Sequence, residues 1–159
     1  MAAYGCTVEW SRGEAAFTDL RYSRAHEWRF DGGAVVRGSS SPHSVKLPFS
    51  DPAAVDPEEA LVASVSSCHM LWFLSLAAAQ GYVVDGYADA AEAQLGPVGF
   101  GRQGITDIVL RPRVAFSGPH RPDDAAVDAL HHVAHERCYI ANSLRTAVRV
   151  EGSWSHAAG

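Results

Sequence analysis

Polar and apolar residues are mixed along most of this chain, but one long segment contains no charged residue. Leu61 to Ala79 runs nineteen residues without Asp, Glu, Lys or Arg. Its length alone would admit a transmembrane helix. Four serines, a cysteine and a histidine interrupt the run, two glutamates precede it, and no Lys or Arg cluster flanks it. This pattern favours a buried helix over a membrane span.

Local signals define both ends of this helix. Asp56 can cap it, Pro57 suits the first helical position, and Glu59 completes a capping box with Asp56. Gly81 can adopt the left-handed conformation that ends a helix. We therefore predict a helix over 57–80, about 36 Å long. Its apolar residues fall on all sides, which predicts burial on most sides by the chain itself or by a partner chain.

The segments before the helix predict a β-meander. Short strand-like pieces occur at Thr7–Trp10, Ala15–Phe17 and Glu27–Phe30, separated by turn residues. Residues 38–52 are rich in Ser, Pro and His without a period, and predict a loop that leads into the helix.

The segments after the helix predict a second group of strands and helices. Residues 82–94 and 105–117 indicate two longer strands around a glycine-rich connection. A second helix is expected over 122–137, followed by a short helical piece through Ser143 and a last strand over 147–151. The order βββ-α-ββ-α-β predicts a single α+β domain over residues 1–159.

Composition narrows the possible partners. The chain has 159 residues, 47% of them hydrophobic, with 13 basic and 18 acidic side chains and a formal charge of −5. Such a chain can bury a sizeable core without disulfides or metal. The acidic balance argues against binding to nucleic acid or to an anionic membrane. The first ten residues lack a secretory signal, so we expect a cytoplasmic, reducing location.

Two of the three cysteines are candidates for chemistry. Cys68 lies in the predicted long helix and Cys138 ends the second one, whereas Cys6 lies near the terminus on a predicted strand. Each is interpretable as an inert buried thiol, but two thiols on core-facing helices could meet as a redox pair. A free thiol is only about 3% ionised at neutral pH, so a reactive one needs a nearby cation. The candidates are the arginines of the expected meander, Arg12, Arg24, Arg29 and Arg37.

Histidines on the second helix allow further interpretations. His131, His135 and Cys138 share one helical face, and His132 adds a further imidazole. The spacing is compatible with metal ligation, with modulation of Cys138, and with histidines that stabilise a helix C-terminus.

The helix around Cys68 resembles a known family. The segment Asp56-Pro-Glu-Glu-Ala-Leu-Val-Ala-Ser-Val-Ser-Ser-Cys68-His69-Met70 is similar to the Asn/Asp-Pro-Glu-(Glu/Gln)-Leu-…-Cys helix of the OsmC/Ohr family of thiol-dependent organic hydroperoxide reductases. The resemblance extends from Tyr22-Ser-Arg-Ala-His26 to the last strand. It implies an OsmC-like fold: an intertwined homodimer, with long central helices packed against curved antiparallel sheets and two active sites at the interface.

The resemblance also implies roles for individual residues. Cys68 corresponds to the peroxidatic cysteine, Cys138 to the resolving cysteine, and Glu58 to the carboxylate that orients an arginine onto the thiolate. Arg24 is the first choice for that arginine, and Arg12 is the alternative. Ten helical residues place Glu58 about 15 Å from Cys68 along the axis, so an arginine must bridge them or come from the partner chain.

The chain departs from the family pattern at two positions. Tyr139 follows Cys138 where the family commonly has proline, and Asp56 stands where Asn is frequent. These departures bear more on the resolving step than on the peroxidatic one.

The expected function is reduction of organic hydroperoxides to alcohols in oxidative-stress defence. The resemblance implies a homodimer without cofactor or metal, recycled by a dithiol or a lipoylated protein, and without nucleic-acid or membrane partners. The alternative is a non-catalytic protein that binds a small ligand or a metal on the same fold.

Overall fold

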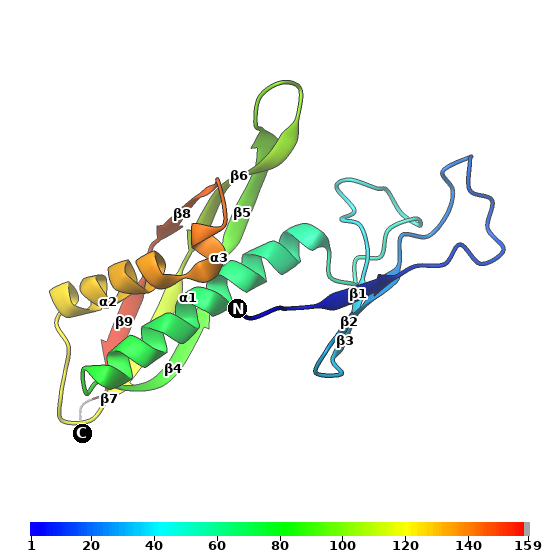
Figure 1. Cartoon of the computed structure of the whole chain (residues 1–159). Coiled ribbons are helices and arrows are strands. Elements are labelled where there is room, and N and C mark those ends of the chain that lie inside the picture. The colour runs from blue at the N-terminus through cyan, green and yellow to red at the C-terminus, as the bar shows by residue number, and fades with distance from the viewer. Residues whose placement is uncertain (158–159) are drawn as a thin grey trace. The chain divides into compact units, whose positions relative to one another are not determined.

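A computed structural model describes residues 1–157 of the chain. They form two compact units, one ending at Ala60 and the other beginning at Leu61. Figure 1 shows the elements of both units along the chain. Each unit is described by itself below.

The first unit contains the predicted meander. Strands β1 (Cys6–Glu9), β2 (His26–Phe30) and β3 (Val35–Gly38) form an antiparallel sheet in the order β1-β2-β3. Gly33, with a φ of 87°, lies in the turn between β2 and β3. The meander is confirmed. Its third strand is β3, at residues where no strand was predicted.

The predicted strand at Ala15–Phe17 is wrong. These residues belong to the connection between β1 and β2, where Phe17 stacks on Tyr22 at 4.7 Å between ring centroids. Trp10 contacts both rings, at 5.9 and 5.4 Å. The apolar side chains in this segment therefore pack in a local aromatic cluster instead of pairing in a sheet.

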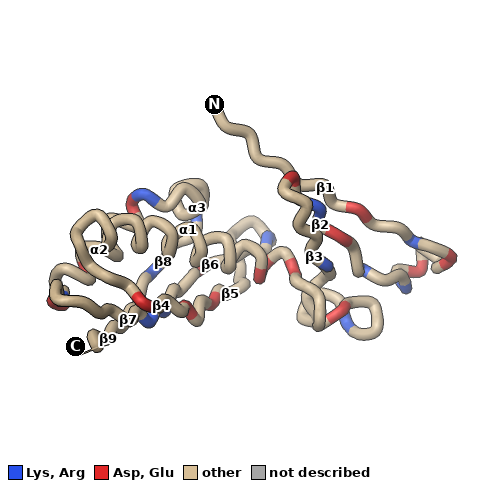
Figure 2. The backbone as a smooth tube through the Cα atoms, turned by 90° about the horizontal axis from the view of Figure 1, so that it is seen from below, with Lys and Arg blue, Asp and Glu red and all other residues tan. Residues whose placement is uncertain are grey.

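Helix α1 (Pro57–Ala79) confirms the central prediction, ending one residue earlier than expected. Its capping box is reciprocal, because the Glu59 amide donates to Asp56 Oδ1 (2.8 Å) and the Asp56 amide donates to Glu59 Oε2 (3.0 Å). Gly81 follows the helix with a φ of 78°, as its C-terminal signal predicted. The uncharged part of α1 is the long tan stretch of its tube in Figure 2.

The two predicted long strands are each divided. Strands β4 (Val83–Asp89) and β5 (Glu92–Pro97) replace the first, and β6 (Gln103–Leu110) and β7 (Pro112–Ser117) replace the second. Asp89 explains the break, because its carboxylate accepts hydrogen bonds from the Arg111 amide (2.6 Å) and from the Ser66 hydroxyl. Pro112 has no amide hydrogen to continue the ladder. The strands therefore enter two separate sheets.

Two C-terminal strands complete these sheets. β8 (Ala147–Val150) confirms the predicted last strand and runs parallel to β6, giving the order β5-β6-β8. β9 (Ser153–His156), which the sequence analysis missed, runs parallel to β7 and gives the order β4-β7-β9. Its Trp154 packs edge-on against Phe116, with 6.0 Å between ring centroids.

Two further helices follow the strands. α2 (Asp124–Arg137) begins after Asp123, whose side chain accepts from the Ala126 amide at 2.8 Å. α3 (Tyr139–Asn142) confirms the short helical piece. The second unit is therefore a mixed α+β structure of helices and small sheets, in agreement with the predicted fold class.

The core of the second unit lies along one stripe of α1. Its fully buried members, Val65, His69, Phe73 and Ala77, recur every four residues. Phe73 and Ala77 pack with buried residues of β7 and α2, and Val65 packs with Ile108 and Leu110 of β6.

The chain itself does not bury α1 on most sides, so the predicted burial on most sides depends on a partner chain. Leu71, for example, is 62% exposed. By length and composition alone α1 would pass as a membrane span, and 22% of its most apolar stretch is buried. Core helices of soluble proteins meet the same criteria, so this finding does not identify a membrane segment.

Candidate functional site

The second unit brings two thiols together from distant parts of the sequence. Cys68 lies in the middle of α1 and is partly buried, whereas Cys138 lies at the junction of α2 and α3 and is completely buried. The Cys68 side chain is close enough to contribute to the rise in the pKa of Cys138, and both cysteines are free. The structure thus brings the two predicted cysteines near each other.

The junction between α2 and α3 fixes the position of Cys138. Its backbone is extended (φ −67°, ψ 106°), which ends α2 and begins α3. The Ala141 amide donates to Cys138 Sγ at 3.4 Å, and Cys138 Sγ lies 4.0 Å from the Val65 carbonyl oxygen. The thiol therefore caps α3 on one side and faces α1 on the other.

The two thiols differ in burial and therefore in solvent access. Removal from water raises the pKa of Cys138 to about 11, because the thiolate would lose its hydration. The amide of Ala141 opposes this effect, and the Cys68 thiol reinforces it. Cys138 is consequently a protonated thiol at neutral pH, while Cys68 is the member of the pair that solvent reaches.

The candidate arginines lie in the first unit. Arg24 Nη1 donates to the Leu20 carbonyl at 2.8 Å and to the Tyr22 carbonyl, and the guanidinium lies 3.9 Å from the Tyr22 ring centroid. Arg12 Nη1 donates to the Ala15 carbonyl at 2.7 Å.

The structure does not bring the expected arginine and carboxylate together. Within residues 1–157, neither Arg24 nor Arg12 forms an ion pair with Glu58. Glu58 is the second residue of α1 and lies in its first turn. The arginine and glutamate roles that the resemblance implies therefore stay predictions.

A buried histidine pair lies beside the thiols and was missed by the sequence analysis. His69 Nε2 and His131 Nδ1 are 3.0 Å apart, and the rings stack with 5.3 Å between centroids. Burial is the main cause that lowers the pKa of both imidazoles to about 4, and the neighbouring His131 contributes to the value for His69. Both imidazoles are therefore neutral at pH 7. The only sequence signal for His69 was its place in the apolar run.

The metal site that the spacing on α2 allowed does not form. His131 bonds to His69 and Cys138 lies near Cys68, so these two side chains do not converge on one site. His132 lies 3.4 Å from Glu136. No group of three or more His, Cys, Asp or Glu side chains is placed to hold a metal ion in the part of the chain that the structure describes.

Comparison with known proteins identifies the family. The model of the family described as OsmC-like protein matches residues 50–153, which include α1, both thiols and the strands of the second unit. The chain belongs to the OsmC-like protein family. The predicted family and its α+β fold, with a long central helix and small sheets, are thus confirmed.

Solved OsmC-like structures share this architecture. An OsmC-like protein of unknown function from Vibrio cholerae is 50% identical, with a TM-score of 0.94 over 96% of this chain and 100% of the other. An OsmC-like protein from Mycoplasma pneumoniae is 14% identical (TM-score 0.72, 98% and 99% covered). An organic hydroperoxide resistance protein from Elizabethkingia anophelis is 16% identical (TM-score 0.69, 99% and 98% covered). No curated protein matches the sequence.

Proposed function

We propose that this OsmC-like chain is a thiol peroxidase that reduces organic hydroperoxides to alcohols, with Cys68 as the attacking thiol and Cys138 as the resolving thiol. The proximity of these two free thiols, seventy residues apart in the sequence, carries the proposal. If both cysteines were inert core residues, Cys68 would not need to be reachable by solvent while lying beside the buried Cys138.

The reaction follows from the pair. The Cys68 thiolate attacks the peroxide O–O bond, the alcohol leaves with a proton, and Cys68 becomes a sulfenic acid. Cys138 sulfur then attacks the Cys68 sulfur, forming a disulfide and releasing water. The two thiols have supplied the two electrons that reduce the peroxide. A dithiol reductant, such as a lipoylated protein, restores them by thiol–disulfide exchange.

The different burial of the two cysteines supports this division of roles. Cys138 is held as a protonated thiol out of solvent, so it does not compete for the peroxide. Its proximity to Cys68 keeps it within reach of the sulfenic acid once that acid forms. A short reach also shortens the lifetime of the sulfenic acid and thus limits overoxidation.

The remaining site residues belong to the same proposal. We assign Arg24 as the cation that stabilises the Cys68 thiolate, with Arg12 as the alternative, and Glu58 as the carboxylate that orients it. Because Glu58 and Cys68 are ten residues apart on one helix, the arginine must span the distance between them.

We further propose a cytoplasmic homodimer without nucleic-acid or membrane partners. The exposed apolar residues of α1, such as Leu71, support a partner that covers the helix. Organic hydroperoxide resistance proteins from Elizabethkingia anophelis and Legionella pneumophila, each 16% identical to this chain, share the fold. The 50% identical protein from Vibrio cholerae is described as having unknown function, so activity must be measured directly.

Consumption of cumene hydroperoxide and tert-butyl hydroperoxide, with dithiothreitol or dihydrolipoamide as reductant, tests the proposal. We expect Cys68→Ser to abolish turnover and Cys138→Ser to allow one turnover followed by stalling or overoxidation. Cys6→Ser, an exposed cysteine remote in sequence from the pair, is the matched control and should retain full activity. Full turnover of Cys68→Ser would refute the mechanism. Stoichiometric zinc in the purified protein, without turnover, would favour the non-catalytic alternative.

A further inference from the structure

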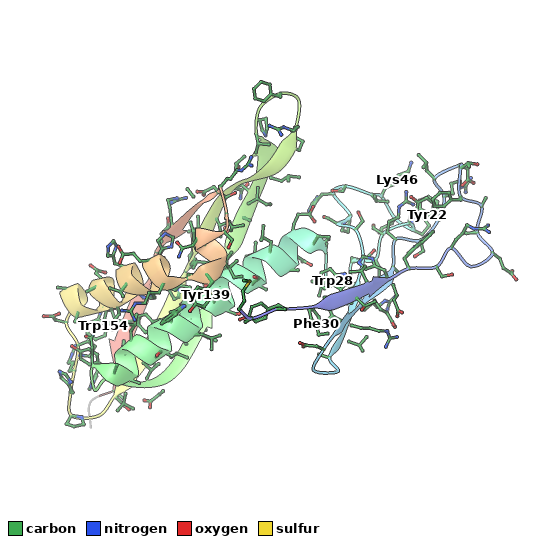
Figure 3. The ribbon with its side chains drawn as sticks, in the orientation of Figure 1. Tyr22, Trp28, Phe30, Lys46, Tyr139 and Trp154 are labelled. Carbon is green, nitrogen blue, oxygen red and sulfur yellow. The ribbon has the colours of Figure 1, made fainter. Side chains whose placement is uncertain are left out.

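A groove on the second unit has no role in the proposed thiol chemistry. It lies between α2 and the strands β8 and β9, and has a volume of about 570 Å³, in the range of small-molecule sites. Val127 of α2 and Val148 and Val150 of β8 give it an apolar wall, together with Trp154 of β9. Figure 3 labels Trp154 on this strand. We call it the α2 groove.

An imidazole of the buried histidine pair opens into the α2 groove. His131 is 7% exposed and lines the groove, and its Nδ1 edge is occupied by His69. Its Nε2 is buried and has no hydrogen-bond partner within residues 1–157. A buried polar nitrogen without a partner is costly, and a bound group could recover that cost. His135, which also lines the groove, has a buried Nδ1 without a partner within residues 1–157, so two imidazole nitrogens are unpaired there.

Gly152 keeps the space beside His131 Nε2 open. A Cβ atom at this position would lie 3.0 Å from His131 Nε2 and 3.4 Å from Pro112 Cγ. The backbone of Gly152 does not have a positive φ, so its conformation does not require glycine. The absence of a side chain instead spares Nε2 a close contact with a Cβ atom.

The rim of the α2 groove is acidic. Asp124 and Asp128 lie one turn apart on α2, and none of the lining residues is Lys or Arg. Asp124 Oδ1 accepts from Trp154 Nε1 at 2.9 Å, which fixes the carboxylate beside the indole. On β8, Arg149 pairs with Asp107 and Glu151 and does not line the groove. The rim therefore favours a cation.

These features together define a ligand class. We propose that the α2 groove binds a small organic amine that also carries a hydroxyl group. The ammonium group binds at the carboxylates of Asp124 and Asp128, and the apolar body lies against the valines and Trp154. The hydroxyl group reaches His131 Nε2. Because Nε2 donates in one imidazole tautomer and accepts in the other, a hydroxyl group satisfies either.

Calorimetric titration with 6-amino-1-hexanol tests the proposal. We expect saturable binding, about fivefold weaker binding of hexylamine, which lacks the hydroxyl group, and no binding of 6-hydroxyhexanoate, in which the charge is reversed. Equal binding of the amine and the carboxylate, or no binding of 6-amino-1-hexanol at millimolar concentration, would overturn it. Zinc chloride, titrated alone, should not produce saturable heats. Tight zinc binding would assign the groove to a metal instead.

Two variants locate the binding. Asp128→Asn, at an exposed position, should weaken binding of 6-amino-1-hexanol about fivefold, whereas Glu136→Gln, an exposed acid on the same helix outside the groove, should not. Gly152→Ala should reduce binding at least tenfold by filling the space at Nε2, with folding checked by circular dichroism. Unchanged affinity in Asp128→Asn, or a loss of equal size in Glu136→Gln, would place the amine elsewhere and refute the assignment.

Discussion

The buried pair of His69 and His131 predicts a steep loss of stability in mild acid. Both imidazoles bind a proton near pH 6.5 in the unfolded chain but only near pH 4 in the folded one, because burial disfavours the charged form. Between these values the unfolded chain binds more protons. The free energy of unfolding therefore falls as the pH decreases through this window.

The size of the effect follows from these values. Lowering the pH from 7 to 5 should cost about 2 kcal/mol for each imidazole, or about 4 kcal/mol for the pair. Two neighbours contribute to the pKa of His69 in opposite directions, since His135 lowers it and Asp89 raises it, and the figure above includes both. A loss of this size is a large fraction of the stability of an ordinary domain.

Urea unfolding at pH 7, 6 and 5, at one fixed protein concentration, measures this loss. The double variant His69→Leu/His131→Leu replaces both imidazoles with apolar groups, and we expect it to lose less than about 1 kcal/mol over the same range. His132→Gln, at a side chain that is 74% exposed, is the control and should keep the wild-type loss. A wild-type change below about 1 kcal/mol, or a full loss in the double variant, would refute the reasoning.

Three further predictions concern the helix ends and the thiols. Asp56→Ala should lower the free energy of unfolding in urea by about 1 kcal/mol, because it removes one half of the capping box; an unchanged value would contradict this. Gly81→Ala should cost about 1–2 kcal/mol in the same assay, because its φ is positive, and a gain in stability would contradict this. At pH 8, where only about one Cys138 thiol in a thousand is ionised, iodoacetamide should modify Cys68 and spare Cys138 until the chain is unfolded. Equal labelling of both in the folded protein, measured by mass spectrometry, would show that Cys138 is neither buried nor protonated.

The ends of α1 could be predicted because they depend on local sequence signals. The ends of the strands depend on long-range contacts and were harder to predict. The capping box and Gly81 act within a few residues, so the sequence defines both ends of the helix. The division of the predicted strand over 82–94 depends on Asp89, which accepts from an amide twenty-two residues later. Alternation of side chains along a strand does not report such a contact, so the break was not predicted.

In the candidate site, too, the residues marked by a local motif were predicted and a long-range contact was not. The resemblance at α1 indicated both cysteines, and the structure places them near each other. The His69–His131 pair joins residues sixty-two apart and was not predicted. The spacing of His131 and His135 on α2 suggested a shared role, but His131 instead bonds across to α1. Spacing along one helix reports which side chains share a face, but not what the opposing element presents to them.

Three of the polar interruptions of the uncharged run have specific neighbours within the second unit. The Ser66 hydroxyl donates to Asp89 at the end of β4, the Cys68 thiol lies near Cys138 at the end of α2, and His69 bonds to His131 on α2. Since buried polar groups are costly unless they are paired, each contact disfavours any other rotation of α1 about its axis. Successive residues of a helix differ by about 100° around that axis, so the burial of His69 on the core stripe turns Cys68 toward the edge of that stripe. Cys68 is therefore held near Cys138 on one side and solvent on the other, which is the arrangement that the proposed peroxidase role would require.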